Sequence, residues 1–325
     1  MSFSKVKYLL LVAILGLSVG LAACGGDDDE TTSGDGSTST AGAIQSNPDN
    51  SSVTLTIGSK NFTEQIVLGE LYSQGLEAAG YDVKTDLNLG SETIARQALK
   101  KGEISGYPEY VSTALTSFYE KDAEQVPSDP NEAFDLVSTE AEGDGLVALP
   151  PTPFSSANAV GLLTSKAEEL NVSTISDLEG QSQDLSLYGS PECRQRIDCL
   201  LGLQQNYGLD FKSFTPVDIG LRYEVLDKGQ ADLSIVFTTD AQLGASDEYT
   251  ILEDDQGVLP AGNVVFLTKQ ATIDEAGPDY ADTIAKVQEG LTIEVMQELD
   301  ARVDIDKEQA SAVASDYLKA AGLIE

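Results

Sequence analysis

The stretch that decides the fold lies at residues 53–65 and reads Val53-Thr54-Leu55-Thr56-Ile57-Gly58-Ser59-Lys60-Asn61-Phe62-Thr63-Glu64-Gln65. Apolar and polar residues alternate over 53–57, which predicts a half-buried β-strand. Residues 58–59 turn the chain, and residues 63–79 predict a helix that ends at Gly80. A strand followed directly by a helix is the repeating unit of an α/β fold.

The same alternation continues along the chain. We expect further strands at 81–89, 104–106, 146–149, 159–163, 185–188 and 233–237, and helices at 92–101, 109–119, 131–142 and 279–323. This order predicts an α/β fold with a mostly parallel sheet covered by helices, and a second alternating region from about 157 to 259. Ligands bind beyond the carboxyl ends of such strands, so a site is expected among the loops 59–63, 106–113, 188–196 and 237–240.

The first 24 residues carry an export signal. Lys5 and Lys7 precede an apolar run over residues 8–23, which is shorter than the ~20 residues that a membrane-spanning helix needs. Small residues then lead into Cys24, an arrangement that resembles the lipobox of bacterial lipoproteins, where this thiol is lipidated. The alternative is a plain signal peptide with an incidental cysteine.

These features predict how the chain is anchored. We expect residues 1–23 to be a lipoprotein signal peptide and Cys24 to carry the lipid. Residues 24–52, which are rich in Gly, Ser, Thr and Asp, predict a flexible acidic tether. The protein would then lie on the extracytoplasmic face of the cell membrane, held by its lipid anchor.

Composition excludes several classes of function. The 325 residues include 54 Asp and Glu against 19 Lys and Arg, a net charge of −35, so surface charge will not attract nucleic acid or anionic lipid. The chain has no His, and it holds no phosphate-binding loop or paired metal-ligand motif. We therefore expect neither an enzyme nor a cofactor or metal. Two interpretations of the negative charge remain. It could keep the protein soluble, as in a salty habitat, or it could attract a cationic solute.

Two further cysteines, Cys193 and Cys199, lie close together in sequence. In an exported chain this spacing predicts a disulfide, and a loop or broken helix between the two residues. The competing interpretation is two free thiols or half of a metal site.

Several blocks follow one another in a fixed order. They are residues 57–65, then Tyr107-Pro108-Glu109-Tyr110-Val111-Ser112-Thr113, then 207–209, 221–223, 239–240, 252–255 and 318–324. Together they resemble the osmoprotectant-binding proteins of ABC importers, the glycine betaine/choline/carnitine family, from residue 53 to the end of the chain. The resemblance implies a two-lobed periplasmic-binding-protein fold, type II-like, with a ligand cleft between lobe 1 (53–153 plus 262–325) and lobe 2 (154–261).

The resemblance also implies ligand contacts. In that family a Lys, a Thr and an Arg bind the ligand's carboxylate, and tyrosines enclose its trimethylammonium group by cation–π attraction. The carboxylate set carries over as Lys60, Thr113 and Arg196, whereas the four tyrosine positions hold Tyr110, Asn158, Phe237 and, approximately, Gly262. Fewer tyrosines than in the family are therefore available to enclose the cation. We expect carboxylated solutes to bind better than choline.

Each of these residues also has a structural interpretation. Lys60 and Arg196 could be solvated surface charges, and Tyr110 could pack a helix. Asp240 could cap the helix after it rather than contact ligand. The remaining aromatic residues near these blocks, Phe62, Tyr107, Phe154 and Tyr188, are expected in the core or the cleft wall.

The predicted function is the extracytoplasmic solute-binding component of an ABC importer for glycine betaine-like osmoprotectants. Its expected partners are a small zwitterionic or quaternary ammonium solute, an ABC permease with its ATPase, and the membrane through the lipid anchor. A solute-sensing lipoprotein, and a binder of a different amino-acid-like zwitterion, are the alternatives.

Overall fold

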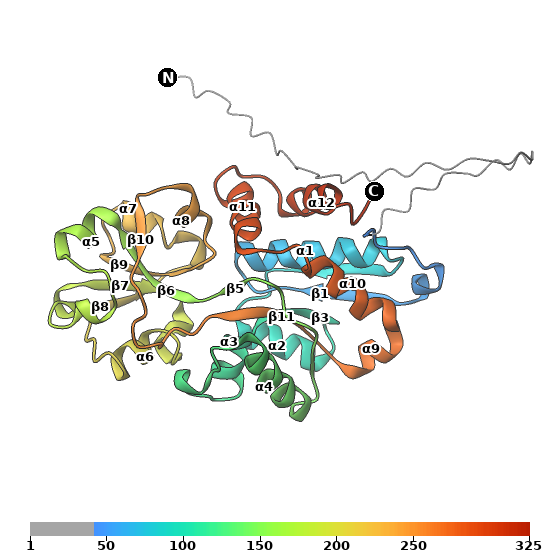
Figure 1. The fold of residues 1–325 in the computed structure, drawn as a ribbon, viewed down its shortest axis with the longest axis horizontal. Coiled ribbons are helices and arrows are strands. Elements are labelled where there is room, and N and C mark those ends of the chain that lie inside the picture. Colours follow the sequence, from blue (N-terminus) through green and yellow to red (C-terminus); the bar gives the residue numbers. More distant parts are fainter. Residues whose placement is uncertain (1–41) are drawn as a thin grey trace, which may run out of the picture. The chain divides into compact units, whose positions relative to one another are not determined.

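Two mixed β-sheets make up the part of the chain that this computed structural model describes, residues 42–325 (Figure 1). The predicted signal peptide, Cys24 and most of the predicted tether lie outside the described residues. We call the first sheet with its helices lobe 1, and the second sheet with its helices lobe 2.

The sheet of lobe 1 has the strand order β2-β1-β3-β11-β4. Its strands are β1 (Thr54–Gly58), β2 (Asp82–Asp86), β3 (Gly106–Tyr110), β4 (Val147–Ala148) and β11 (Gly262–Thr268), with the short β5 (Ser155–Ser156) paired to β11. β1 runs parallel to β2 and β3, whereas β11 runs antiparallel to β3 and β4. All five residues of β3 are buried, so β3 forms the centre of this lobe.

Helices pack around the sheet of lobe 1, and their apolar residues form two clusters with it. One cluster joins the sheet to α1 (Thr63–Ala78), α10 (Pro278–Gln288), α11 (Ile293–Asp304) and α12 (Ala310–Ala320). The other joins it to α2 (Glu92–Lys101), α3 (Val111–Thr113) and α4 (Pro130–Gly143), and α9 (Gln270–Ala276) follows β11. Fully buried side chains such as Leu68 and Leu71 of α1 anchor these contacts.

The sheet of lobe 2 has the order β10-β6-β9-β7-β8. Its strands are β6 (Asn158–Leu163), β7 (Ser186–Gly189), β8 (Ser213–Pro216), β9 (Leu233–Phe237) and β10 (Tyr249–Ile251). β7 is parallel to β8 and β9, and β6 is antiparallel to β9 and β10. Its helices are the short α5 (Thr164–Leu170), α6 (Leu200–Gln205), α7 (Glu224–Asp227) and α8 (Ala241–Ala245).

The chain passes from lobe 1 to lobe 2 between β5 and β6 and returns between β10 and β11 (Figure 1). The prediction of a mostly parallel sheet was wrong, because each sheet contains both parallel and antiparallel pairs. β6 and β11 each enter a sheet directly from the other lobe. Such a strand needs no helical crossover, so it can lie antiparallel to its neighbour.

Two segment predictions need correction. The helix expected at 109–119 begins only at Val111, because Glu109 and Tyr110 extend β3 and pair with β11. Residues 44–52, which composition assigned to the tether, pack on lobe 1. The Ile44 N–H donates to the Leu323 carbonyl (2.9 Å), and the buried Asn50 side chain donates to the Ala79 carbonyl (2.9 Å).

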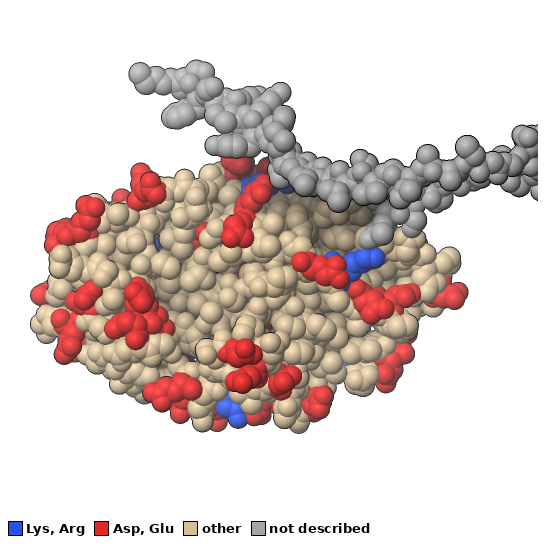
Figure 2. Space-filling model, in the orientation of Figure 1, with Lys and Arg blue, Asp and Glu red and all other residues tan. Residues whose placement is uncertain are grey.

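Acidic side chains are dispersed over the face seen in Figure 2, with few basic ones among them. None of the helices within residues 42–325 has the length and apolar character that crossing a bilayer requires.

Candidate ligand-binding site

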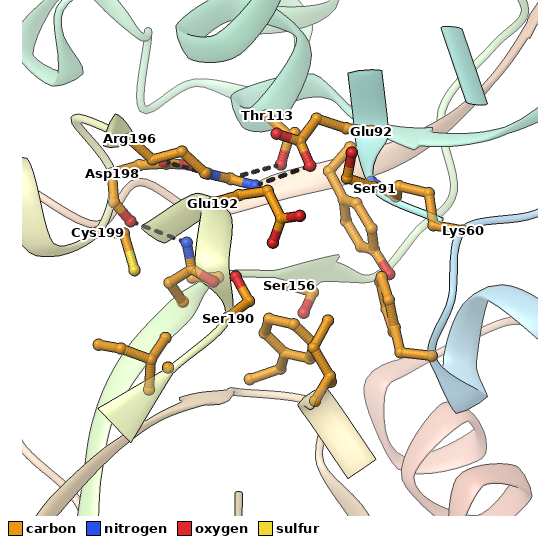
Figure 3. Close-up of a pocket in the computed structure, with 18 of the residues that line it drawn as sticks. Lys60, Ser91, Glu92, Thr113, Ser156, Ser190, Glu192, Arg196, Asp198 and Cys199 are labelled. Carbon is orange, nitrogen blue, oxygen red and sulfur yellow. Dashed lines mark hydrogen bonds and ion pairs between the residues drawn. The ribbon is translucent and has the colours of Figure 1, made fainter. Parts of the chain in front are cut away.

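A pocket lies between the two lobes. Lobe 1 supplies the loop before α1, the first turn of α2 and the end of β3 with α3. Lobe 2 supplies the start of β6, the end of β7 with the loop at 190–199, the segment 217–222 before α7 and the end of β9 (Figure 3). Its cavity volume is about 70 Å³. A single water needs ~10–15 Å³ by this measure, so the pocket can hold a small solute or several waters.

The pocket brings together residues that sequence analysis selected from separate stretches. Its wall includes Lys60, Tyr110, Thr113, Asn158, Arg196 and Phe237. Gly262 is not on the wall. A Cβ at Gly262 would lie 2.5 Å from the Ser112 backbone nitrogen, so this backbone has no room for a side chain there. Leu259 and Pro260 line that side of the pocket instead.

Arg196 lies in the loop that the Cys193–Cys199 disulfide closes, and the predicted disulfide is present. Its Nε donates to Oδ1 of Asp198 at 2.8 Å, and its Nη2 donates to both Asp198 and Oγ1 of Thr113, the latter at 3.3 Å. Its Nη1 lies 3.6 Å from Oε2 of Glu92. Burial acts to lower the pKa of Arg196, but the Asp198 carboxylate outweighs burial and the pKa is raised. Arg196 is therefore a cation fixed in place by Asp198, and its contacts with Thr113 and Glu92 join lobe 2 to lobe 1.

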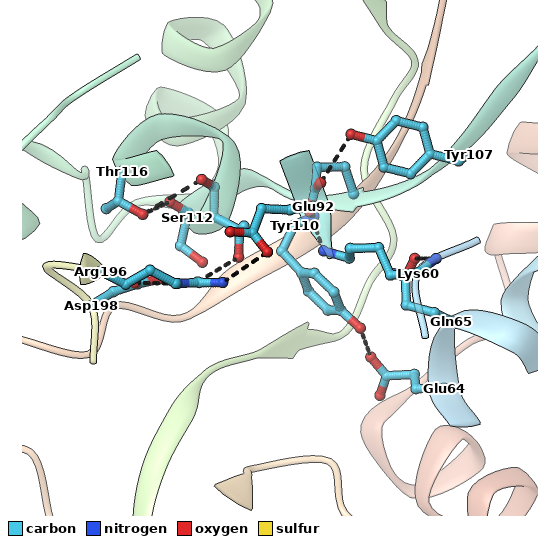
Figure 4. A network of polar contacts seen from close by, with 12 residues as sticks. Lys60, Glu64, Gln65, Glu92, Tyr107, Tyr110, Ser112, Thr116, Arg196 and Asp198 are labelled. Carbon is cyan, nitrogen blue, oxygen red and sulfur yellow. Dashed lines mark hydrogen bonds and ion pairs between the residues drawn. The ribbon is translucent and has the colours of Figure 1, made fainter. Parts of the chain in front are cut away.

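Lys60 is buried, with 4% of its surface exposed, so it is not a solvated surface charge. Its ammonium pairs with the fully buried Glu109 and lies 4.5 Å from the centre of the Tyr110 ring. Glu109 also accepts from the Tyr107 hydroxyl at 3.0 Å and from the Tyr110 N–H at 2.8 Å, and Figure 4 shows Lys60, Tyr107 and Tyr110 around this point. The charge of Lys60 is thus largely committed to Glu109.

Three aromatic rings form one side of the pocket. The Phe62 ring lies 6.2 Å from that of Tyr110 and 5.0 Å from that of Phe237, measured between ring centres. The Tyr110 hydroxyl donates to the buried Glu64, and burial followed by the Glu64 charge raises its pKa well above the usual value. Tyr110 belongs to β3 rather than to a helix, and it packs in the core cluster that joins the sheet of lobe 1 to α1, so it has the structural role expected of it as well as a place on the pocket wall.

All three rings already face a cation of the chain. The Lys60 ammonium lies 4.5 Å from the centre of the Tyr110 ring and 5.8 Å from that of Phe62, and the Arg222 guanidinium carbon lies 4.4 Å from the centre of the Phe237 ring. Asp240 does not cap α8 through its side chain. It accepts from Arg222 Nε at 2.9 Å and from the Phe237 N–H at 2.9 Å, so it holds Arg222 against the ring.

Asn158 supports the loop that carries Arg196. Its Nδ2 donates to the Asp198 carbonyl at 2.8 Å, which uses part of the amide that a ligand could otherwise contact.

Sequence analysis missed several wall residues. Phe62 was expected in the core or the cleft wall, and it does line the pocket, whereas Arg222 was named only as part of a family block. Glu92, Glu192 and Asp198 were not selected at all, although all three line the pocket. Two signals were available: Glu92 opens a helix directly after a strand and loop, and Asp198 lies two residues from Arg196 in the same short loop.

The chemistry of the pocket suits a small zwitterion. A guanidinium and a hydroxyl can bind a carboxylate, and aromatic faces with nearby carboxylates can bind a cation. Within residues 42–325 no group of three or more acidic or Cys side chains is arranged to hold a metal ion.

Comparison with known families decides the identity. Residues 53–320 match the OpuAC family, described as the substrate binding domain of ABC-type glycine betaine transport systems. The chain belongs to this family. As an OpuAC protein it is a substrate-binding component of an ABC transporter, and the predicted family is confirmed.

Named relatives support this assignment. The chain is 32% identical over 283 residues to a glycine-betaine-binding protein of Pseudomonas aeruginosa, covering 84% of this chain and 89% of that protein. It is 25% identical over 274 residues to the carnitine transport binding protein OpuCC of Listeria monocytogenes, covering 82% of this chain and 86% of that protein.

The predicted two-lobed periplasmic-binding fold is also confirmed. The crystal structure of a glycine betaine/carnitine/choline ABC transporter matches with a TM-score of 0.65 at 24% identity, covering 82% of this chain and 98% of that one. The crystal structure of lactococcal OpuAC in complex with glycine betaine matches with a TM-score of 0.59 at 14% identity, covering 82% of this chain and 96% of that one.

Proposed function

We propose that this OpuAC protein is an extracytoplasmic lipoprotein that captures a carboxylated quaternary ammonium solute, of the glycine betaine or carnitine kind, and delivers it to an ABC permease driven by its ATPase. It performs no chemical reaction on the solute. The two lobes at 53–153 plus 262–325 and at 154–261 enclose the solute between them.

One observation carries the proposal. Six residues selected from five separate stretches of sequence line a single pocket between the lobes. Scattered surface residues would not converge in this way, and convergent polar and aromatic groups in a pocket are the usual mark of a ligand site.

The solute's carboxylate is assigned to Arg196 and Thr113, because these two side chains present N–H and O–H donors at the lobe boundary. Its ammonium group is assigned to the rings of Phe62, Tyr110 and Phe237, where it shares the aromatic side of the pocket with Lys60 and Arg222. Since the family's other tyrosine positions correspond to Asn158 and the side-chain-free Gly262, the cation contributes less to affinity than the carboxylate does.

The lipid anchor is assigned to Cys24. The basic residues, the apolar run and the small residues before Cys24 support export and lipidation. Two acyl chains would hold the protein at the membrane, near the permease.

A second candidate solute is an amino-acid-like zwitterion with N–H donors. Glu192 extends into the pocket and makes no hydrogen bond or ion pair with other residues of the described part of the chain (Figure 3). A primary ammonium group could donate hydrogen bonds to this carboxylate, whereas a trimethylammonium group could not.

A thermal-shift screen of the mature protein tests the proposal. A solute present at 100 times its dissociation constant stabilises the folded state by about 2.7 kcal/mol, which raises the melting temperature by several degrees. We expect glycine betaine or carnitine to do so more than choline. A shift with amino acids alone would favour the second candidate, and no shift with any of these solutes at millimolar concentration would contradict the proposed function.

A further inference from the structure

The guanidinium of Arg196 has two edges that can bind carboxylates. The edge formed by Nε and Nη2 is taken by Asp198, which lies two residues away in the same loop. The other edge, formed by Nη1 and Nη2, faces lobe 1. There it meets Thr113 at 3.3 Å and Glu92 at 3.6 Å (Figure 3).

That second edge is where a ligand's carboxylate has to bind, since Asp198 fills the first. Glu92 already presents a carboxylate there from the first residue of α2. The contact is enclosed, because only 18% of the Arg196 side chain and 10% of the Glu92 side chain are exposed. At 3.6 Å it is an ion pair without a good hydrogen bond, so a carboxylate with better geometry can replace it.

We propose that Glu92 is an internal competitor for the ligand's carboxylate, and that its ion pair with Arg196 is a latch that holds the two lobes together when no solute is bound. This inference rests on the proposed function, because it assumes a carboxylated solute. Arg196 comes from lobe 2, while Glu92 and Thr113 come from lobe 1, so their contacts bridge the lobes without any ligand.

Competition follows from electrostatics. A solute carboxylate that approaches Nη1 comes within a few ångströms of the Glu92 carboxylate, and two like charges at that range in a partly buried site repel strongly. Glu92 therefore has to move away, or the solute binds less tightly. Either way, Glu92 lowers the affinity for carboxylated solutes. It does not lower the affinity for choline in this way, because choline has no carboxylate.

The first test is calorimetry of Glu92→Gln with glycine betaine and with choline. The amide keeps the size of the side chain and removes its charge. We expect the glycine betaine affinity to rise roughly twofold to fivefold, the factor that an ion pair of this kind is worth, with no gain for choline. Glu132→Gln is the matched control, because Glu132 is an exposed glutamate in the first turn of another lobe 1 helix, α4, away from the pocket.

Glu192→Gln separates competition at Arg196 from a general change in pocket charge. It removes a carboxylate that lines the same pocket but does not pair with Arg196. A gain with Glu192→Gln or Glu132→Gln as large as that with Glu92→Gln, or an equal gain for choline, would overturn the proposal. So would an unchanged glycine betaine affinity in Glu92→Gln.

The second test needs no ligand. Small-angle scattering of the solute-free protein should show a larger radius of gyration for Glu92→Gln than for wild type and Glu132→Gln, because loss of the latch lets the lobes separate. An unchanged radius would overturn the latch. If wild-type protein bound no carboxylated solute, the proposed function would fail, and the scattering result would still decide whether Glu92 holds the lobes together.

Discussion

Replacing Lys60 by methionine separates a structural role of this residue from contact with ligand. The Lys60 ammonium neutralises Glu109, which is fully buried. Lys60→Met keeps the length of the side chain and leaves that carboxylate without its cation. Removing one partner of a buried ion pair costs about 3–5 kcal/mol. Hydrogen bonds from Tyr107 and Tyr110 remain on Glu109, so we expect a loss near the lower end, about 3 kcal/mol.

A loss of that size corresponds to a fall in melting temperature of about 6–12 °C, since 1 kcal/mol shifts it by about 2–4 °C in a protein of this size or slightly smaller. Thermal unfolding followed by circular dichroism measures it. Lys100→Met is the matched control. The Lys100 side chain is 43% exposed and pairs with Asp144 at 2.5 Å, so its loss should cost less than about 1 kcal/mol.

The double variant Lys60→Met/Glu109→Gln completes the test. It removes both charges, so most of the lost stability should return. We also expect this variant to bind glycine betaine, because Lys60 is committed to Glu109 rather than to the solute. The reasoning is refuted if Lys60→Met costs no more than Lys100→Met, or if Glu109→Gln fails to restore stability. A stable double variant that no longer binds would make Lys60 a direct ligand contact.

Three further predictions concern other parts of the chain. Cys24→Ala should release the protein from membranes or leave an unprocessed precursor, and unchanged fractionation with unchanged acyl labelling would contradict the anchor. Reducing the Cys193–Cys199 disulfide should weaken carboxylate binding, because it frees the loop that carries Arg196; calorimetry with and without reductant measures this, and equal affinities would count against it. Asp300 is buried, and burial followed by the Glu64 charge raises its pKa well above the usual value. The stability that Asp300 contributes in its protonated form is therefore fully present below the unfolded-state pKa of about 4. It is lost as the pH rises through the folded-state pKa. Asp300→Asn should thus raise the melting temperature more at pH 8 than at pH 4, and an equal shift at both would contradict this assignment.

Local sequence pattern predicted much of the fold. The helix at 92–101 and the strand at 233–237 were predicted with the bounds that the structure has, because their periodicity and end signals agree. Strand direction was not predictable from local pattern. It depends on where the chain crosses between lobes, and the crossings before β6 and β11 leave no periodic signal.

Only part of the site was predicted, because some of its contacts also depend on how the two lobes come together. Thr113 belongs to one of the resembling sequence blocks and Arg196 lies between Cys193 and Cys199, so the resemblance selected each of them separately. The pairing of Glu92 with Arg196 could not be predicted, since the two residues meet only when the two lobes come together. The tether was misjudged at residues 44–52 because polar side chains such as Asn50 become buried by specific hydrogen bonds that composition does not reveal.

The most direct test of the central claim is isothermal titration calorimetry of the mature protein with glycine betaine, carnitine and choline, repeated with Arg196→Ala. The account predicts that a carboxylated solute binds more tightly than choline and that Arg196→Ala abolishes this binding, because the solute's carboxylate loses its charged partner in a partly buried pocket. Tight choline binding that Arg196→Ala leaves unchanged would contradict the account.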